Sequence, residues 1–399
     1  MDTHGRPFIV SSFSVVDHQH MAHALRLAEH GLYTTQPNPR VGCVIAHGGE
    51  VVGSGWHRRA GGPHAEVHAL REAGERSRGA TAYVTLEPCA HHGRTPPCAD
   101  ALVAAGVARV VVAAEDPFPH VAGRGIARLR AAGIGVDIGL LRDEARELNV
   151  GFFSRIERGR PFVRVKLAMS LDGRTALANG ESKWITGEAA RADVQRWRAR
   201  SSAILTGSGT VLADNPRLTV RPEEGLSPRP SERAQDEEEM DRAEAFRLER
   251  EGIVPPLRVI LDRRLRTPAG SHVLDGSAPA LLLHGAQAAV PDGRFLQVER
   301  AVVTGRDGAL DLRAVLALLA ARGCNEVHVE AGPTLCGALF AAALADELLL
   351  YVAPVLLGDA ARPLLHLPSL ADMAGRWKLR LVDQRMLGPD MRLRLRPTQ

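Results

Sequence analysis

The chain has 399 residues, more than one hydrophobic core usually holds, so we expect two domains. Hydrophobic residues make up 45% of it but aromatic residues only 4%, which disfavours a stacking surface for single-stranded nucleic acid. The net charge of +4 is small for this length and does not by itself indicate a nucleic-acid partner.

The N-terminus and the cysteine content predict where the protein acts. Residues 1–18 lack a basic stretch followed by a long apolar run, so they do not resemble a signal peptide. No segment approaches the roughly 20 apolar residues of a membrane span. Five cysteines, two of them in a metal-like motif, suit a reducing compartment better than a disulfide framework. We therefore expect a cytoplasmic protein without a membrane or nucleic-acid partner.

Helix and strand patterns alternate along the first 140 residues. Residues 18–31 have the periodicity of an amphipathic helix, and residues 41–57 predict a hairpin that turns at Gly48 and Gly49. Further helices are predicted over 64–74, 98–106 and 125–134, with strands over 81–87 and 108–116. This pattern is typical of a layered α/β domain, which we place at residues 1–158.

A second α/β pattern follows a helical connector at 142–161, which ends at Gly159 and Pro161. Strands are predicted over 162–170, 202–207, 257–262, 278–285 and 347–358, and helices over 187–200 and 311–323. Residues 326–344 predict a strand, a glycine turn and a helix, and the alternating tail at 377–396 predicts antiparallel edge strands. We place this domain at 159–399, with a charged surface insertion without catalytic role at about 222–256.

One stretch of the first domain carries metal chemistry. His64, Cys89 and Cys98 supply one imidazole and two thiolates, enough for a three-ligand zinc site with an open fourth position. Glu66 lies two residues from the histidine, where it moves protons without binding the metal. Cys98 begins a predicted helix, whose dipole favours the thiolate. The layout is typical of a zinc-activated water that replaces an amino group.

An alternative for this stretch is a closed structural zinc site. His91 or His92 would then be the fourth protein ligand, and the carboxylate of Glu66 would have no chemical role.

The motifs around the zinc candidates narrow the interpretation. The runs PNPRVGCVI (37–45), GWH (55–57), GGPHAEVHAL (61–70) and PCAHHGRTPPC (88–98) resemble the bifunctional riboflavin-biosynthesis enzymes, which fuse a pyrimidine deaminase to a reductase. The resemblance implies an N-terminal cytidine-deaminase-like α/β/α layered domain and a C-terminal dihydrofolate-reductase-like α/β domain. It implies one Zn²⁺ per chain held by His64, Cys89 and Cys98, with Glu66 as proton shuttle. It further implies substrate contacts at Asn38, His57 and Asp116.

The chain departs from the family pattern after Asp116. The family usually has the run DPNP there, whereas this chain has Phe118 in place of the asparagine. A contact that depends on that amide is therefore not expected here.

Glycine turns follow strands of the second domain at 207–214 and 330–337, and such turns suit the close approach of a phosphate. Together they resemble the family's reductase domain, which uses NADPH. By position, the resemblance implies substrate contacts at Lys166, Ser182, Arg198, Leu218, Arg221 and Glu330, with the arginines suited to a phosphate. It implies NADPH contacts at Ala168, Trp184, Thr210, Asp214, Gly332, Pro333, Thr334, Leu335, Cys336, Gly337 and Ala338.

A second departure concerns the cofactor. Where the family often has serine after the acidic residue that ends the strand at 257–262, this chain has Arg263. We hypothesise that Arg263 favours the 2′-phosphate of NADPH.

The preferred function is sequential chemistry on phosphorylated pyrimidines. The first domain is expected to hydrolyse the 2-amino group of 2,5-diamino-6-(5-phosphoribosylamino)pyrimidin-4-one. The second is expected to reduce the ribosyl group of the product with NADPH, and a homo-oligomer, specifically a dimer, is expected. Two alternatives stay open on the residues alone: a nucleic-acid deaminase with the same zinc motif, and a non-catalytic, zinc-stabilised binding protein.

Overall fold

The computed structural model describes residues 13–90, 97–119, 121–221, 252–289, 295, 297–306 and 308–398. Two compact units divide these residues, with the main boundary between Glu157 and Arg158. His91, His92 and most of the charged insertion lie outside the described residues. None of the helices in the described ranges combines the length and the apolar character that a membrane crossing requires.

A five-stranded sheet with strand order β2–β1–β3–β4–β5 forms the centre of the first unit. Its strands are β1 (Gly42–His47), β2 (Glu50–Trp56), β3 (Thr81–Leu86), β4 (Arg109–Ala114) and β5 (Gly135–Ile138). β1 pairs antiparallel with β2 and β3, whereas β3, β4 and β5 are parallel. The predicted hairpin is confirmed, because His47 pairs with Glu50 across the two glycines.

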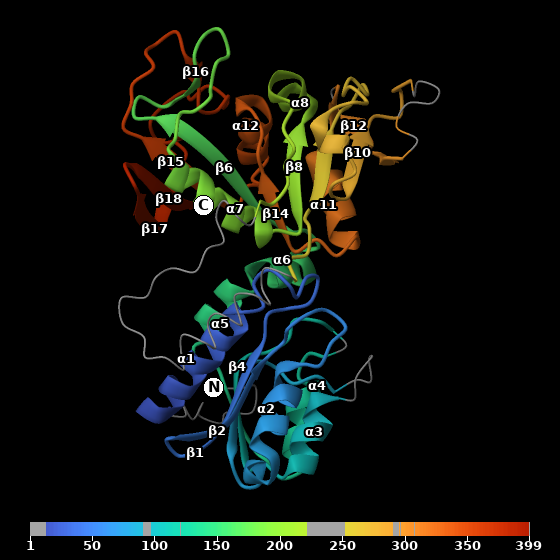
Figure 1. The fold of residues 1–399 in the computed structure, drawn as a ribbon, viewed down its shortest axis with the longest axis vertical. Coiled ribbons are helices and arrows are strands. Elements are labelled where there is room, and N and C mark those ends of the chain that lie inside the picture. The colour runs from blue at the N-terminus through green and yellow to red at the C-terminus, as the bar shows by residue number, and fades with distance from the viewer. Residues whose placement is uncertain are drawn as a thin grey trace. The chain divides into compact units, whose positions relative to one another are not determined.

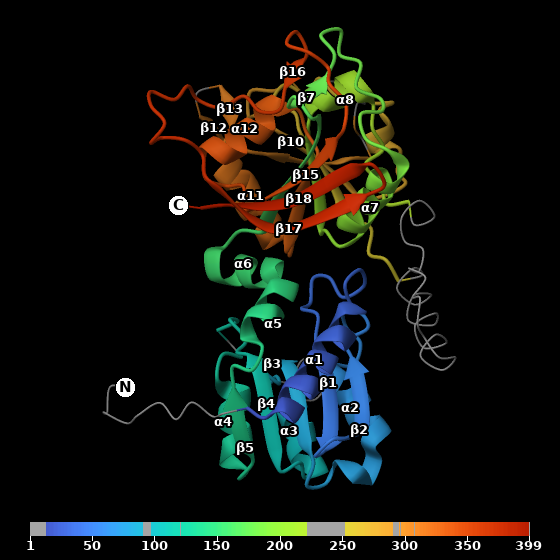
Figure 2. The same cartoon turned by 90° about the vertical axis from the view of Figure 1, so that its left-hand side faces the viewer.

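Helices cover both faces of this sheet (Figure 1, Figure 2). One face carries α1 (Val15–Glu29) and α5 (Arg142–Leu148). The other carries α2 (Ala65–Ala73), α3 (Cys98–Ala105) and α4 (Arg124–Ala131), and a 3-10 turn (Gly74–Ser77) follows α2. The central strands are buried almost throughout because apolar residues are needed on both of their faces. Gly55 lets α2 pack closely, since a Cβ there would lie 2.6 Å from the Ala65 carbonyl oxygen.

The connector differs from the single helical stretch that the sequence predicts. It consists of α5 and of α6 (Val150–Arg158), separated by Asn149. Asn149 leaves helical geometry, with φ −108° and ψ 23°, and its side chain bonds the backbone of Arg40. A contact across the fold therefore interrupts a helix that local periodicity alone would continue.

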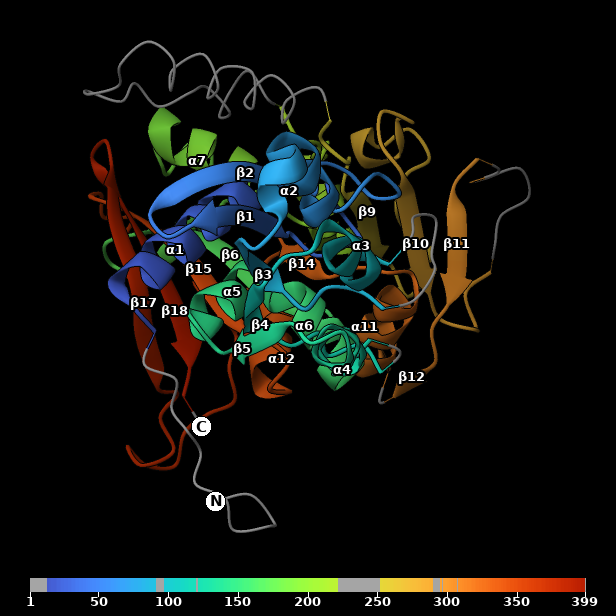
Figure 3. The same ribbon diagram turned by 90° about the horizontal axis from the view of Figure 1, so that it is seen from below.

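A nine-stranded sheet forms the centre of the second unit, in the order β11–β10–β9–β8–β14–β6–β15–β18–β17. Its strands are β6 (Phe162–Ser170), β8 (Ala203–Gly207), β9 (Leu257–Leu261), β10 (Ala280–His284), β11 (Glu299–Val302), β14 (Glu326–Val329), β15 (Glu347–Ala353), β17 (Leu379–Leu387) and β18 (Asp390–Pro397). Neighbours from β11 to β15 are parallel. The predicted antiparallel tail is confirmed: β18 and β17 close one edge and β11 the other (Figure 3).

Helices also cover both faces of the second sheet. On one face α11 (Leu312–Ala321) and α12 (Pro333–Ala341) pack onto the largest apolar core. On the other, α7 (Glu188–Ala199) packs against β15, and α8 (Ser208–Asp214) packs against β8 and β9. A 3-10 turn (His272–Leu274) and two small strand pairs complete the unit: β7 (Arg174–Ala176) with β16 (Arg362–Pro363), and β12 (Gly305–Arg306) with β13 (Ala309–Leu310). The sequence did not predict these short pairs, which are too brief to show periodicity.

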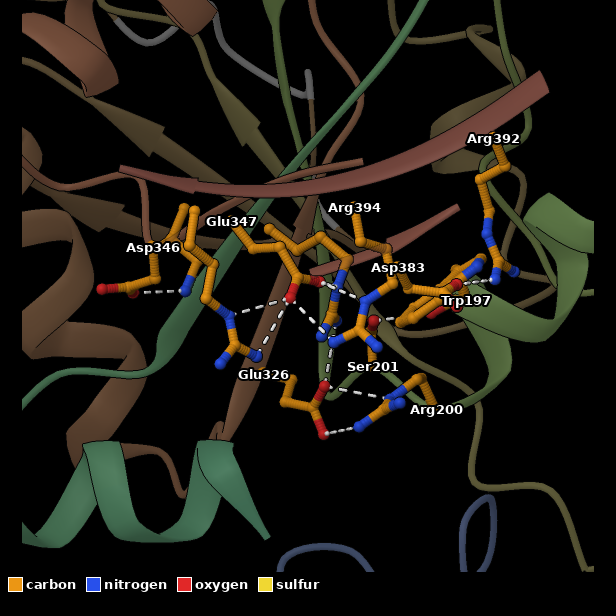
Figure 4. Close-up of polar contacts among 12 residues, drawn as sticks. Trp197, Arg200, Ser201, Glu326, Asp346, Glu347, Asp383, Arg392 and Arg394 are labelled. Carbon is orange, nitrogen blue, oxygen red and sulfur yellow. Dashed lines mark hydrogen bonds and ion pairs between the residues drawn. The ribbon is translucent and has the colours of Figure 1, made fainter. Parts of the chain in front are cut away.

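Buried ion pairs tie the strands of the second unit to α7 (Figure 4). The carboxylate of Glu347 is fully buried and accepts from Arg164 Nε at 2.7 Å, Arg394 Nη2 at 2.9 Å and Arg396 Nη2 at 3.0 Å. Arg164 also donates to Glu326, at 3.0 Å. Burial alone would raise the pKa of Glu347, but Arg164 and Arg394 lower it to about 2. The carboxylate therefore holds β6, β15 and β18 together in its charged form.

We expect Glu347→Gln to lower the free energy of unfolding of the second unit by about 3–5 kcal/mol, because three arginines would lose their buried counter-charge. Urea denaturation measures the loss, and hydrogen exchange in β15 and β18 localises it. Glu299→Gln is the matched control: its pair with Arg322 is exposed, so its removal should cost less than about 1 kcal/mol.

The pH dependence of stability gives a second test of Glu347→Gln. Because the folded-state pKa of Glu347 lies below its usual value, its stabilisation is complete above about pH 4.5 and is lost as the pH falls toward about 2. Glu347→Gln should lack this part of the acid transition. Equal losses in the two variants at neutral pH would contradict the assignment.

Candidate functional site

Three different elements bring the predicted zinc ligands together. His64 is the N-cap of α2, Cys98 is the first residue of α3, and Cys89 lies just beyond the end of β3. Both predicted helix starts are confirmed. The two helix N-termini direct their partial positive charge toward this point, which favours thiolates there.

The spacing of the three side chains fits a zinc ion. His64 Nδ1 lies 3.3 Å from Cys98 Sγ and 3.6 Å from Cys89 Sγ, and all three ligand atoms lie within 4.8 Å of one another. Tetrahedral zinc with normal Zn–N and Zn–S bonds separates such atoms by about 3.5 Å. Within the described ranges, this is the one cluster of metal-binding side chains with such geometry.

Glu66 lies beside this cluster on the first turn of α2. It is 3% exposed, and its Oε2 atom has no hydrogen-bond partner among the described residues. Burial raises the pKa of Glu66, although His64 opposes the shift. A buried carboxylate with an unused oxygen suits proton transfer to and from a small molecule held at the cluster.

The two thiols differ in acidity. Interaction with Cys98 and with His64 lowers the pKa of Cys89, whereas interaction with Cys89 and burial raise the pKa of Cys98. The backbone N–H of Cys98 also donates to Cys89 Sγ, at 3.4 Å. Zinc binding requires both thiolates, so it would release a proton from Cys98.

Glu87 anchors the segment that leads to Cys89, a role that the sequence did not reveal. Its carboxylate is 4% exposed and accepts backbone N–H bonds at 2.9–3.3 Å from Asp116, Gly123, Gly125 and Ile126. Gly125 is required for this approach, because a Cβ there would lie 1.8 Å from the Pro88 carbonyl oxygen. An acidic residue at a strand end gives no signal that four distant amides converge on it.

Two of the predicted substrate residues lie side by side. Asn38 Nδ2 is 3.1 Å from His57 Nε2, and His57 Nδ1 is 3.0 Å from the Pro63 carbonyl oxygen. Because an amide nitrogen only donates, Nε2 accepts and Nδ1 carries the proton. Burial lowers the pKa of His57, which keeps the imidazole neutral. The rings of His57 and His64 are 5.3 Å apart, so this pair borders the zinc ligands.

Asp116 follows β4, and its carboxylate accepts a bond from the Phe118 N–H at 2.8 Å. The aspartate therefore shapes its own turn, and Phe118 is 39% exposed. A substrate contact of Asp116 stays a prediction.

A cavity of about 1340 Å³ opens at the carboxyl ends of β6, β8, β9 and β14 in the second unit. Its volume exceeds the roughly 300–1,000 Å³ typical of a single small ligand, so a dinucleotide and a second molecule can share it. Of the predicted reductase residues, those that line it are Lys166, Ala168, Ser182, Trp184, Arg198, Thr210, Asp214, Leu218, Arg221, Glu330, Gly332, Pro333, Thr334, Leu335 and Ala338. Cys336 and Gly337 are buried in α12 and do not line the cavity.

Arg198 has a different environment from the one expected. Its Nε and Nη2 atoms form a bidentate pair with Glu330 at 2.6 and 2.8 Å, and Nη1 donates to the Thr219 carbonyl oxygen. Burial would raise the pKa of Glu330, but Arg198 holds it well below its usual range. The ion pair with Glu330 already occupies the fork of Arg198, so its phosphate contact stays a prediction.

Further basic residues line the cavity from segments that the sequence motifs did not identify. Arg263, Arg264 and Arg266 follow β9, and Arg362 and His366 belong to the segment after β15. His366 Nδ1 lies 3.1 Å from Thr334 Oγ1 at the start of α12. Only Arg263 was singled out from the sequence, because charged residues in loops carry no periodic signal.

Comparison with known proteins identifies the family. A family model described as the RibD C-terminal domain matches residues 161–393, and one described as the cytidine and deoxycytidylate deaminase zinc-binding region matches residues 14–114. The chain is 48% identical to riboflavin biosynthesis protein RibD of Escherichia coli K12, over 95% of this chain and 99% of that protein. It is 45% identical to the Haemophilus influenzae RibD, over 96% and 98%. The chain belongs to the RibD family.

Solved RibD structures agree. Acinetobacter baumannii RibD matches with a TM-score of 0.84 and 45% identity, covering 96% of this chain and 99% of that one. A Thermotoga maritima protein, described as a diaminohydroxyphosphoribosylaminopyrimidine deaminase and 5-amino-6-(5-phosphoribosylamino)uracil reductase, matches with a TM-score of 0.80 and 32% identity over the same shares.

Family membership confirms the resemblance stated from the motifs. The chain is a bifunctional enzyme of riboflavin biosynthesis, with a cytidine-deaminase-like first domain and a RibD reductase second domain of dihydrofolate-reductase-like fold. Its cofactors are Zn²⁺ and NADPH, and the ligand cluster and the cavity fit them. The nucleic-acid deaminase and the non-catalytic zinc protein are thereby set aside as families for this chain.

Proposed function

We propose that the first domain, residues 1–158, hydrolyses the 2-amino group of 2,5-diamino-6-(5-phosphoribosylamino)pyrimidin-4(3H)-one to give 5-amino-6-(5-phosphoribosylamino)uracil and ammonia. The observation that carries this proposal is the unused, buried Oε2 atom of Glu66 beside the cluster of His64, Cys89 and Cys98. A structural zinc site has no use for such a carboxylate, whereas hydrolysis requires a group that accepts and returns a proton.

The residues at and around the cluster have separate roles in metal binding, proton transfer and substrate binding. His64, Cys89 and Cys98 would hold the zinc ion, which acts as a Lewis acid and makes water acidic near neutral pH. Glu66 first transfers a proton from the attacking water to the ring nitrogen, and then transfers the proton of the new C2 hydroxyl group to the departing amine. A bond from oxygen to C2 forms, the bond from C2 to nitrogen breaks, and ammonia leaves. Asn38 and His57 hold the pyrimidine against the cluster, with Asp116 as a further contact.

We further propose that residues 159–399 reduce the ribosyl group of the uracil product to a ribityl group, for which NADPH supplies the hydride. The substrate residues are Lys166, Ser182, Arg198, Leu218, Arg221 and Glu330. The cofactor residues are Ala168, Trp184, Thr210, Asp214 and the turn at 332–338. Support comes from the convergence of most of these on one cavity, where the N-terminus of α12 faces the ligand space.

We expect Glu66→Gln to lower the rate of ammonia release about 10²- to 10⁴-fold, because the amide cannot take the proton. Zinc content should remain one ion per chain, and NADPH oxidation with the uracil substrate should not change. Elemental analysis, ammonia assay and absorbance at the NADPH band measure the three quantities.

The unmodified protein sets the reference for this variant. Given the diaminopyrimidine phosphate, it should release ammonia without NADPH and oxidise NADPH only after that release. Cys98→Ser should lose zinc and ammonia release together. Full ammonia release by Glu66→Gln would refute the deaminase mechanism.

We propose that Arg263 favours NADPH over NADH through the 2′-phosphate. Its side chain packs against Gly285, and it lines the cavity together with Arg264. Arg263→Ser should raise the Kd of NADPH about 10-fold and leave the Kd of NADH unchanged, since a charge-assisted bond is lost only with the phosphate. Fluorescence titration measures both constants. Arg264→Ser is the matched control, and equal effects of the two variants, or an unchanged NADPH affinity, would reject the assignment.

We propose a homodimer that forms through β17, acting in the cytoplasm. None of the five cysteines of the chain, all of them in the described ranges, forms a disulfide, which suits a reducing compartment. β17 is an edge strand, and its exposed Leu379, Leu381 and Met386 leave backbone groups and apolar surface available to a second copy. Antiparallel edge pairing is compatible with a two-fold axis.

Light scattering should give twice the mass of one chain for the unmodified protein and a single chain's mass for Leu381→Arg. Val302→Arg on β11, the opposite edge of the same sheet, should leave the dimer intact, because its side chain is similarly exposed but outside the proposed contact. Dissociation by Val302→Arg alone would place the interface at the other edge.

A further inference from the structure

The junction between α5 and α6 forms three hydrogen bonds with Arg40, a residue of a loop far away in the sequence. Asn149 is 2% exposed, and its side-chain amide accepts from the Arg40 N–H and donates to the Arg40 carbonyl oxygen, both at 2.8 Å. Arg40 is 5% exposed and reaches back, with Nη1 donating to the Leu148 carbonyl oxygen at 2.7 Å. Three hydrogen bonds thus fix one residue of the loop from both sides.

The loop that Arg40 belongs to carries one wall of the deaminase site. Asn38 lies two residues earlier, and the carbonyl oxygen of Val41, the next residue, accepts the His57 N–H at 2.9 Å. Asn38 and His57 also meet through their side chains, at 3.1 Å. The position of Arg40 therefore determines where both of these side chains stand.

An amide is the side chain that this contact requires. It donates and accepts at once, so it satisfies the N–H and the C=O of the same residue, whereas a carboxylate only accepts. Buried backbone groups left without a partner are costly, so loss of the amide should displace the loop rather than leave it in place. Water would then enter beside Arg40, and Asn38 and His57 would lose their fixed spacing.

We propose that Asn149 is a positioning residue of the deaminase: it fixes the 38–41 loop so that Asn38 and His57 meet the pyrimidine. Asn149 acts at a distance and contacts neither of these side chains in the hydrogen bonds above. The inference rests on the proposed substrate role of Asn38 and His57, and it extends the deaminase site to the connector.

Steady-state kinetics of the full chain tests the proposal. Asn149→Ala should raise the KM for the diaminopyrimidine phosphate about 10-fold and change kcat less than about 2-fold, the result expected when roughly one or two hydrogen bonds that position the substrate are lost. Zinc content should stay at one ion per chain, and NADPH oxidation with the uracil substrate should stay unchanged. Asn149→Asp keeps the bond from the Arg40 N–H, so its KM should lie between that of the unmodified protein and that of Asn149→Ala.

Two comparisons separate positioning from general destabilisation. Tyr83→Phe removes another buried hydrogen bond of the same unit, to Asp17 at 2.9 Å, and should leave KM unchanged. In the double variant Asn38→Ala with Asn149→Ala, the rise in KM should be smaller than the product of the two single rises, because Asn149 acts in part through Asn38. Multiplied effects, or a fall in kcat and zinc content with KM unchanged, would overturn the proposal.

The outcomes also distinguish a failure of the proposed substrate role of Asn38 from a failure of the positioning role of Asn149. If Asn38→Ala leaves KM unchanged, the proposed substrate role of Asn38 fails and the inference fails with it. If Asn38→Ala raises KM but Asn149→Ala does not, only the positioning role fails. Should Asn149→Ala not fold, Asn149→Asp decides, because it removes a single bond from the same place: an unchanged KM there would reject the role.

Discussion

A buried charge is costly unless an opposite charge or hydrogen bonds compensate it. The buried carboxylates of the two units differ in how fully they are compensated. Glu347 has three arginines around its carboxylate, and Glu330 has the fork of Arg198. Glu66 is as deeply buried, yet its Oε2 atom has no partner among the described residues. A bound zinc ion nearby and a polar substrate would supply the compensating charge and the hydrogen bond for this oxygen. Asp262 also has a buried oxygen without a partner, Oδ1, but its Oδ2 accepts the Thr267 N–H and no cluster of metal-binding side chains lies beside it in the described residues. An unpaired carboxylate oxygen next to a ligand cluster therefore marks the reacting centre, and the three arginines on Glu347 mark the framework of the second unit.

In the second unit, the buried ion pairs around Glu347 and the residues that line the cavity lie next to each other along α7 and β14. Trp197 packs under the guanidinium of Arg164 at 4.4 Å, and the next residue, Arg198, pairs with Glu330 at the cavity. Glu326 and His328 of β14, and Glu330 directly after the strand, alternate along one face from the ion network to the cavity. Burial holds the pKa of His328 at about 3, with the surrounding arginines acting in the same direction. A neutral imidazole thus separates the two groups of charges without adding another positive charge.

Local patterns predicted the parts of both sites that lie on one short segment. His64, Glu66 and Cys98 were identified because helix starts, ligand types and spacing are all local properties, and the turn at 332–338 was found in the same way. The sequence did not predict the pair of Arg198 with Glu330, the four amides on Glu87 or the break at Asn149. Each of these depends on residues far apart in the chain, whose approach follows from tertiary packing and not from periodicity. His91, His92 and the charged insertion lie outside the described residues, so the closed zinc site stays untested.

The net charge of the chain gives no sign of a local excess of positive charge in the second unit. A net charge of +4 predicts an ordinary surface, yet among the described residues ten basic side chains and three acidic ones line the cavity. The basic ones are Lys166, Lys183, Arg191, Arg198, Arg217, Arg221, Arg263, Arg264, Arg266 and Arg362, and the acidic ones are Asp214, Asp262 and Glu330. Glu330 offsets Arg198, and Asp275 offsets Arg217, but the excess elsewhere is large. Within a concave wall such an excess attracts anions far more strongly than the same charges spread over a surface. The cavity is therefore suited to two phosphate-bearing molecules at once, which a reductase of a sugar phosphate with a phosphorylated cofactor requires.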